Sequence, residues 1–199
     1  MIRDAYRFLI PLLLLVILFA ALRFVYASFV FFILALFIAF FFRNPSRKIP
    51  EGKNLIVSPA DGKVVKISHN ESGERCVSIF LNIFNVHVNR SPIAGKLEQL
   101  QYKRGKYKVA FDEDASNVNE QNILTIKGED IQVTFKQIAG LIARRVVCWK
   151  QPGSKLSRGE RIGLIRFGSR ADVILPEKVR ILVSVGDKVC GGSSVLGDY

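Results

Sequence analysis

A long apolar stretch near the N-terminus sets the main limit on how this chain can fold. Residues 8–22 carry no charge, Arg23 interrupts them, and residues 24–42 are again apolar. A helix needs about 20 apolar residues to cross the hydrocarbon core of a bilayer. The second run is therefore long enough to span it, and the first is of marginal length. We expect residues 1–43 to form a hydrophobic membrane anchor of one or two helices.

Basic residues flank this stretch at both outer ends, namely Arg3 and Arg7 before it and Arg43, Arg47 and Lys48 after it. Positive residues concentrate on the cytoplasmic side of membrane segments. A hairpin of two helices would therefore place both ends, and the domain that follows, on the cytoplasmic side of the cell membrane. A single span with a helical preamble and a re-entrant anchor are the alternatives. A cleaved signal peptide is disfavoured, because the apolar stretch is too long and no small-residue cleavage site follows it.

Residues 44–199 have a different pattern. Two prolines within residues 43–50 end the apolar stretch, and short alternating runs separated by Gly, Pro and Asn follow. Such runs predict a mainly β fold, a β-rich sandwich or barrel with little helix. Residues 152–163 and 185–197 share a spacing of glycines and apolar pairs, and they resemble the closing half of a biotinyl- or lipoyl-type barrel-sandwich. We therefore expect a barrel-sandwich-like C-terminal part.

The net charge of +12 limits the classes of molecule that this chain is expected to bind. Residues 1–50 hold six Lys or Arg and one Asp, so most of the charged residues lie in the β-rich part, which also has a positive balance. A basic domain tethered to a bilayer is attracted to anionic lipid. Nucleic acid is disfavoured, because the basic residues are scattered among acids and no recognition motif is present. Three separated cysteines without metal-ligand spacing predict a reducing compartment and no metal site.

The pair Gly168-Ser169 lies between two strand-like runs, residues 162–167 and 171–175, and the second run stops at Pro176. Gly and Ser are common turn residues. On local pattern alone, this pair predicts a turn between two strands.

The wider stretch Arg166-Phe-Gly-Ser-Arg170, followed by Asp172-Val-Ile-Leu-Pro176, resembles the self-cleavage site of phosphatidylserine decarboxylase proenzymes of the short, pyruvoyl-dependent type. The closely similar archaetidylserine decarboxylases are included in this resemblance. It extends over roughly residues 40–199. Four further stretches agree in order: Ser58-Pro-Ala-Asp-Gly62, Phe84-Asn-Val-His-Val-Asn-Arg-Ser-Pro92, Asn119-Glu120 and Gln137-Ile-Ala-Gly-Leu-Ile-Ala-Arg-Arg145.

The resemblance implies a zymogen that cleaves itself between Gly168 and Ser169. The Ser169 hydroxyl would attack the Gly168 carbonyl, and elimination would release chain 1–168 and leave a pyruvoyl group at the start of chain 169–199. This covalent cofactor would form a Schiff base with an aminophospholipid and release CO2. The implied enzyme is a carboxy-lyase of phospholipid biosynthesis that makes phosphatidylethanolamine. Its two chains would stay together as a heterodimer or form a higher oligomer, and diacyl and ether lipids both remain open as substrates.

The resemblance also suggests roles for individual residues. His87 lies where longer decarboxylases have His-x-x-His, whereas this chain has His87-Val-Asn-Arg90. Either one histidine serves both self-cleavage and decarboxylation, or Arg90 binds a phosphate or carboxylate. Asp61 is the candidate to orient His87 and stabilise its charge, which would give an Asp-His-Ser arrangement. The alternative for Asp61 is an ordinary Asp-Gly hairpin turn.

Two aromatic residues flank the proposed site, Phe84 and Phe167. They line a lipid-facing pocket or belong to the core, and the sequence does not separate these roles. The rival function is a non-enzymatic, membrane-anchored barrel-sandwich adaptor, which explains the anchor but not His87 or the Gly-Ser site. A carrier domain is a poorer alternative, because the lysine-centred hairpin of such domains is missing.

Overall fold

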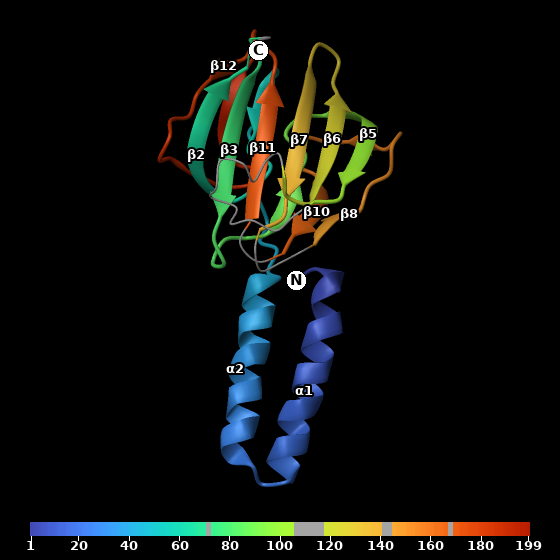
Figure 1. Ribbon diagram of the computed structural model, residues 1–199, viewed down its shortest axis with the longest axis vertical. Helices are drawn as coiled ribbons and strands as arrows, with labels where there is room; N and C mark the ends of the chain where they lie inside the picture. The colour runs from blue at the N-terminus through green and yellow to red at the C-terminus, as the bar shows by residue number, and fades with distance from the viewer. Residues whose placement is uncertain (71–72, 106–117, 141–144, 167–168) are drawn as a thin grey trace. The chain divides into compact units, whose positions relative to one another are not determined.

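The computed structural model describes residues 1–70, 73–105, 118–140, 145–166 and 169–199. The chain divides into two compact units, Met1–Ser46 and Arg47–Tyr199. Figure 1 shows the first as helical and the second as a β domain.

The helical unit consists of a short 3-10 turn, η1 (Arg3–Ala5), and two helices, α1 (Tyr6–Ala21) and α2 (Val25–Phe41). The helices lie side by side (Figure 1). Ser28 Oγ donates a hydrogen bond to the Val16 carbonyl at 2.9 Å, and the rings of Phe19 and Phe31 stack at 5.3 Å. Arg23, in the connection, has a φ of 62°. The apolar stretch therefore forms a hairpin of two helices.

The helical surface is apolar. Ile17 is 65% and Phe29 is 62% exposed, values that would be unfavourable for a soluble helix pair in water. Arg3–Ala21, at 19 residues, is long and apolar enough to cross a membrane, whereas Val25–Phe41 is shorter. The first helix is the longer one because η1 extends α1, whereas α2 begins one residue after the apolar run 24–42 starts and ends one residue before it stops. An apolar N-terminal helix indicates membrane association.

Among the described residues of the β domain, the strands form three sheets. The large sheet has eight strands, in the order β13 (Lys188–Val189), β2 (Gly62–His69), β3 (Arg75–Leu81), β11 (Ser169–Leu175), β7 (Gln132–Ile138), β6 (Gln121–Lys127), β5 (Gly95–Lys103) and β9 (Lys155–Leu156). A second sheet has the order β4 (Val88–Arg90), β10 (Arg161–Ile165) and β8 (Val146–Cys148). A third has the order β1 (Leu55–Val57), β14 (Val195–Asp198) and β12 (Arg180–Ile181).

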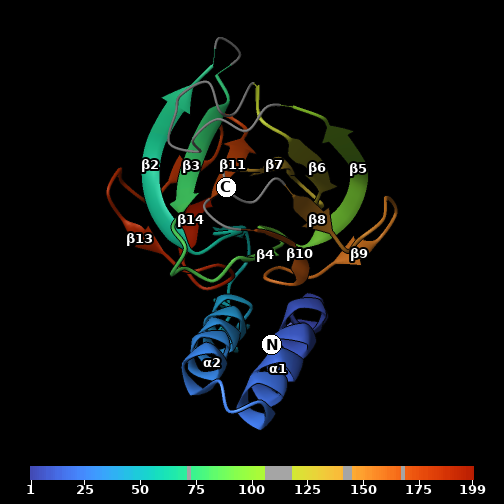
Figure 2. The ribbon, with the colours of Figure 1, turned by 60° about the horizontal axis from the view of Figure 1, so that its bottom comes forward.

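The large sheet curls around an apolar interior, as Figure 2 shows for the arc from β2 to β5. Alternate residues of its strands face inward, so Ala171, Val173 and Leu175 of β11 are fully buried. They belong to one core cluster with residues of the neighbouring strands β3, β7 and β6. Burial of this common face is the main stabilising term of the domain.

The mainly β fold with an apolar helical segment before it is confirmed. The two strands on either side of the Gly168-Ser169 pair, β10 and β11, belong to different sheets. Ser169 is itself the first residue of β11. Gly168 and Phe167 lie outside the described residues.

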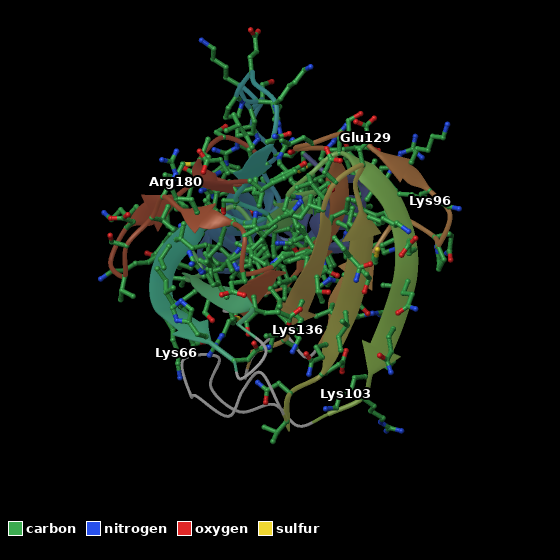
Figure 3. All side chains as sticks on the ribbon, turned by 90° about the horizontal axis from the view of Figure 1, so that it is seen from above. Lys66, Lys96, Lys103, Glu129, Lys136 and Arg180 are labelled. Carbon is green, nitrogen blue, oxygen red and sulfur yellow. The ribbon has the colours of Figure 1, made fainter. Side chains whose placement is uncertain are left out.

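Charged side chains surround the β domain. Figure 3 shows Lys66, Lys96, Lys103 and Arg180, among others, at separate points of its periphery. The basic residues are therefore spread over the surface, as the sequence indicated.

Candidate active site

Ser169 begins β11 in the middle of the large sheet, opposite Leu81 of β3. By strand alternation its side chain faces inward with Ala171 and Val173. It is fully buried, and its Oγ has no hydrogen-bond partner among the described residues. A buried hydroxyl without a partner is unfavourable for folding. Such a group is a candidate for chemistry.

Side chains on the opposite face of β11 hold this strand in place. Arg170 Nε lies 2.7 Å from Asp172 Oδ1, and Arg170 also donates to Ser78 Oγ of β3 at 2.8 Å. Arg170 and Asp172 are 6% and 2% exposed. Burial, and then the charge of Asp172, raise the pKa of the nearby Cys76 thiol to about 11. The segment after Ser169 is therefore held by a buried ion pair as well as by its two neighbouring strands.

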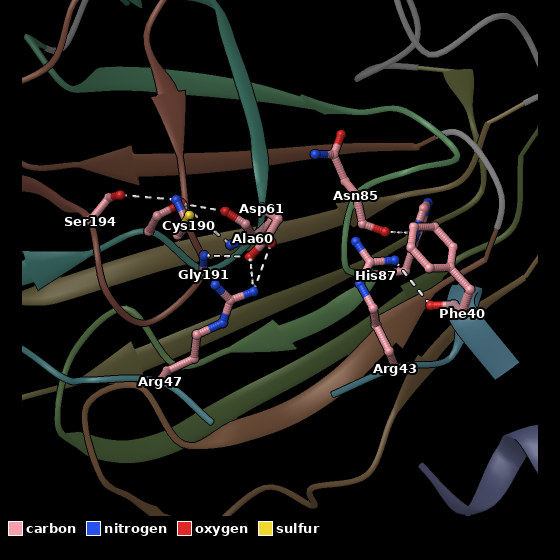
Figure 4. A network of polar contacts seen from close by, with 11 residues as sticks. Phe40, Arg43, Arg47, Ala60, Asp61, Asn85, His87, Cys190, Gly191 and Ser194 are labelled. Carbon is pink, nitrogen blue, oxygen red and sulfur yellow. Dashed lines mark hydrogen bonds and ion pairs between the residues drawn. The ribbon is translucent and has the colours of Figure 1, made fainter. Parts of the chain in front are cut away.

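His87 is 2% exposed and lies directly before β4. Its Nδ1 lies 2.9 Å from the Asn85 carbonyl oxygen (Figure 4). A carbonyl can only accept, so Nδ1 carries the proton and donates. In the neutral ring, Nε2 is then the basic nitrogen. The backbone itself thus selects the tautomer that can accept a proton.

Ile165 and Ser169, two described residues near the predicted cleavage point, both have backbone partners close to the connection between β3 and β4. Ile165 N donates to the His87 carbonyl at 3.2 Å, and Ser169 pairs with Leu81. Leu81 is the last residue of β3, and His87 is the last residue of the connection from β3 to β4. This connection therefore lies near Ile165 and Ser169.

Asp61 has its own set of partners. Both carboxylate oxygens accept from Arg47 Nη2, at 2.9 and 2.7 Å, and Oδ1 accepts from Gly191 N at 2.8 Å (Figure 4). Its side chain and that of Arg47 are 12% and 13% exposed. In this structure the group that orients His87 is the Asn85 carbonyl, and the carboxylate of Asp61 is engaged by Arg47 and Gly191. The orienting contact predicted for Asp61 is therefore not made in this conformation.

Arg90 lies at the end of β4, and its Nη1 donates to the Gly159 carbonyl at 2.9 Å. Burial, and then the positive charges of Arg47 and Arg161, lower the pKa of Arg90. Its backbone N donates to the Pro59 carbonyl at 2.8 Å, which brings the segment of Asp61 alongside β4. These contacts support the fold around the site.

Phe84 lies in the connection between β3 and β4 and is 64% exposed. The side chain of Asn82 caps this connection, because Asn82 Oδ1 accepts from Phe84 N at 2.9 Å. The exposure is compatible with a lipid-facing position. It excludes the alternative that Phe84 is a core residue.

Sequence reasoning did not identify a set of buried amides in the same interior. Gln137 donates to Asn89 Oδ1 at 2.9 Å and accepts from Asn122 at 2.9 Å. Gln137 begins one of the stretches that resemble the decarboxylases, and Asn89 follows His87 by two residues. Their position in those stretches was the available signal. The contact between Gln137 and Asn89 could not be predicted from the sequence, since the two residues belong to different strands.

Comparison with known proteins identifies the family. The sequence model of the family described as phosphatidylserine decarboxylase matches residues 34–197. A protein of Solibacter usitatus is 54% identical over 164 residues, covering 82% of this chain and 79% of the relative. A protein of Carboxydothermus hydrogenoformans is 44% identical over 204 residues, covering 99% and 95%. Both relatives are named phosphatidylserine decarboxylase proenzyme. This chain therefore belongs to the phosphatidylserine decarboxylase family.

Proposed function

We propose that this chain is a membrane-bound phosphatidylserine decarboxylase proenzyme, a carboxy-lyase that cleaves itself between Gly168 and Ser169. Family membership supports the activity. The observation that carries the cleavage site is the buried Ser169 hydroxyl, which has no hydrogen-bond partner in the described part of the chain and faces the interior of the domain. The adaptor alternative explains neither this hydroxyl nor the family match.

In the proposed maturation, His87 Nε2 takes the proton of Ser169 Oγ, and Oγ attacks the carbonyl carbon of the preceding residue. The bond from His87 Nδ1 to the Asn85 carbonyl fixes the ring for this transfer. The peptide becomes an ester, and elimination separates the chains. The pyruvoyl group that arises from Ser169 supplies an electrophilic ketone and an electron sink for decarboxylation. Residue 169 is a suitable place for it, because the position is buried and faces inward.

Asp61 keeps its proposed catalytic role only indirectly. Its carboxylate ties Arg47 and the Gly191 backbone together on the segment that lies alongside β4. We propose that Arg90 and Phe84 contribute to the substrate side, Arg90 through its charge near the phospholipid head group and Phe84 through its exposed ring. Phe167 stays a prediction of the sequence.

The two chains are expected to remain together after cleavage. β11 lies between β3 and β7, so residues 169–199 keep backbone pairing with both strands of the larger chain. β14 pairs with β1 and β13 pairs with β2. We therefore expect a heterodimer that separates only on unfolding, and assembly into a higher oligomer stays a prediction.

We place the enzyme at the cell membrane with the β domain on the cytoplasmic side. The apolar helix α1 supports the membrane association. The side is proposed from Arg3, Arg7, Arg43 and Lys48, which flank the hydrophobic stretch at both ends. Arg47, counted with these residues in the sequence, is instead bonded to Asp61.

The test is the intact mass of the purified chain in detergent, together with a denaturing gel. We expect two pieces, residues 1–168 and 169–199, the second carrying a ketone that borohydride reduces. A Ser169→Ala chain should remain whole and should not release CO2 from vesicles that contain phosphatidylserine. A wild-type chain that stays in one piece with no reducible ketone would remove the enzyme proposal and favour the adaptor.

A further inference from the structure

Three buried amides form a chain of hydrogen bonds across the interior of the β domain. Asn122 Nδ2 donates to Gln137 Oε1 at 2.9 Å, and Gln137 Nε2 donates to Asn89 Oδ1 at 2.9 Å. Gln137 and Asn89 are fully buried and Asn122 is 6% exposed. The chain links the large sheet, through β6 and β7, to β4 of the second sheet.

A backbone group fixes the direction of this chain. Gln137 Nε2 also lies 3.3 Å from the Val147 carbonyl oxygen, which can only accept. The nitrogen of Gln137 must therefore face Val147 and Asn89, and its oxygen must face Asn122. It follows that Asn89 turns its oxygen toward Gln137. Its Nδ2 points elsewhere, with both protons available for donation.

Asn89 Nδ2 is a buried donor without a partner in the part of the chain that the structure describes. Leaving such a donor unpaired is unfavourable, and most buried amides in folded proteins avoid it. An apolar side chain of the same size would fill the position without this cost. The position therefore indicates that the donor has a ligand during some step of the protein's action.

The strands bring this donor to the candidate site. Asn89 pairs with Gly163 of β10, and the bond from Ile165 N to the His87 carbonyl continues this pairing, so His87 and Asn89 lie two residues apart on one extended segment. Residues two apart on a strand face the same side. Asn89 therefore faces the same interior as His87.

The large sheet makes the second connection. Gln137 lies opposite Ala171 on β11, and Ser169 is two residues from Ala171 on the same face. Diagonal neighbours of this kind have Cα atoms about 7–8 Å apart. Asn89 thus bonds to a side chain that is a diagonal neighbour of Ser169. The side chains of His87, Ser169 and Asn89 therefore all face the same interior region of the β domain.

We propose that Asn89 Nδ2 is the donor that stabilises the negative oxygen formed when Ser169 attacks the peptide bond before it. Gln137 and Asn122 are positioning residues that keep the nitrogen of Asn89 turned toward the site. This inference rests on the proposed function, because it names a further residue for the self-cleavage step. A preorganised amide donor requires no reorganisation at the moment of attack.

Atoms and charge balance in this step. Ser169 Oγ gives its proton to His87 Nε2 and bonds to the carbonyl carbon of residue 168, whose oxygen becomes negative and accepts from Asn89 Nδ2. The carbon–nitrogen bond then breaks, and the proton held by His87 passes to the departing amine of residue 169. The product is an ester between residue 168 and the Ser169 side chain. No cofactor or co-reactant is consumed.

The test uses Asn89→Leu in the full-length chain, synthesised in a cell-free system with phospholipid nanodiscs and followed on denaturing gels. Loss of one oxyanion donor slows such reactions about 10²–10³-fold, and we expect a slowing of that size. Unfolding temperatures are compared in a Ser169→Ala background, so that both chains are uncleaved. There the unfolding temperature of the Asn89→Leu variant should stay close to that of its parent, because the substitution removes a buried donor without a partner and also the Oδ1 acceptor of Gln137.

Asn119→Leu is the matched control. Asn119 is also a fully buried amide, but its Nδ2 already donates to the Ala139 carbonyl at 2.9 Å. Its replacement should lower the unfolding temperature and leave the cleavage rate within a few-fold of wild type. The two substitutions therefore differ in both measurements: Asn89→Leu slows cleavage at nearly constant stability, and Asn119→Leu lowers stability at a nearly constant cleavage rate. A purely structural role for Asn89 would give it the signature of Asn119.

Hydroxylamine, which cleaves esters, identifies the step. If Asn89 acts before the ester, the Asn89→Leu variant should accumulate no hydroxylamine-sensitive species. Accumulation of that species, or maturation of Asn89→Leu within about threefold of wild type, would overturn the inference while the proposed function stands. A wild-type chain that stays whole would remove the proposed function and this inference together.

Discussion

Two buried polar regions of the β domain differ in how their groups are satisfied. Around Asp61, every carboxylate oxygen has a donor, from Arg47 or from the Gly191 backbone. Around Ser169 and Asn89, the described residues offer no partner for the hydroxyl or for the amide nitrogen. Both regions are shielded from water, so the contrast does not reflect exposure. We infer that the region around Asp61 supports the fold and that the groups around Ser169 and Asn89 take part in the reaction.

His87→Gln should give the largest effect on the second region. Glutamine keeps a polar side chain of similar length but cannot act as a base. Removal of a general base slows reactions about 10²–10⁴-fold, so maturation should slow by that factor. The gel assay measures it. In the Ser169→Ala background the unfolding temperature should stay within about 3 °C, which corresponds to roughly 1 kcal/mol for a domain of this size. A large drop would place His87 in the structural group with Asp61.

Arg47→Ala should have its effect on the first region. It leaves the carboxylate of Asp61 buried with the Gly191 backbone as its remaining donor. Breaking one side of a buried pair costs about 3 kcal/mol or more, which corresponds to a fall of roughly 10 °C in Tm. Thermal unfolding in detergent measures this loss. Arg47→Lys keeps the charge but not the two-oxygen contact, and it should lose less.

Asp61→Asn tests whether Asp61 supports the fold through Arg47 or acts directly beside His87. The substitution keeps the size of the side chain and removes its charge. If Asp61 serves the fold through Arg47, then Asp61→Asn and Arg47→Ala should affect stability and maturation in the same proportion. Maturation that fails with Asp61→Asn but proceeds with Arg47→Ala would assign the carboxylate a direct role beside His87.

The smallest expected effect concerns the reactivity of Cys76, which lies near the outer face of β11. Burial and Asp172 raise the pKa of Cys76 to about 11, so at pH 8 its reactive thiolate is scarce. Cys190 is exposed. Iodoacetamide at pH 8 should therefore alkylate Cys76 about tenfold more slowly than Cys190, as followed by peptide mass. Equal rates would mean that this face of β11 opens readily and that the Arg170–Asp172 pair does not seal it.

The broad organisation of the chain could be predicted from its amino-acid pattern. The two uncharged apolar runs are too long for ordinary strands and favour helices, and α1 and α2 follow them. Alternating runs indicated most of the strands, because one side chain in two must face the core. Ser169 and His87 were reached through resemblance to a family, and their burial agrees with a site in the interior.

Which polar groups meet could be learned only from the folded chain. Alternation tells which face of a strand a residue occupies, but the neighbouring strand depends on sheet order and register. Asn89 and Gln137 are 48 residues apart and come from different sheets, and Asp61 meets Arg47 in place of His87. These choices follow from how the whole core packs, since a buried polar group bonds to whatever partner the fold brings within reach.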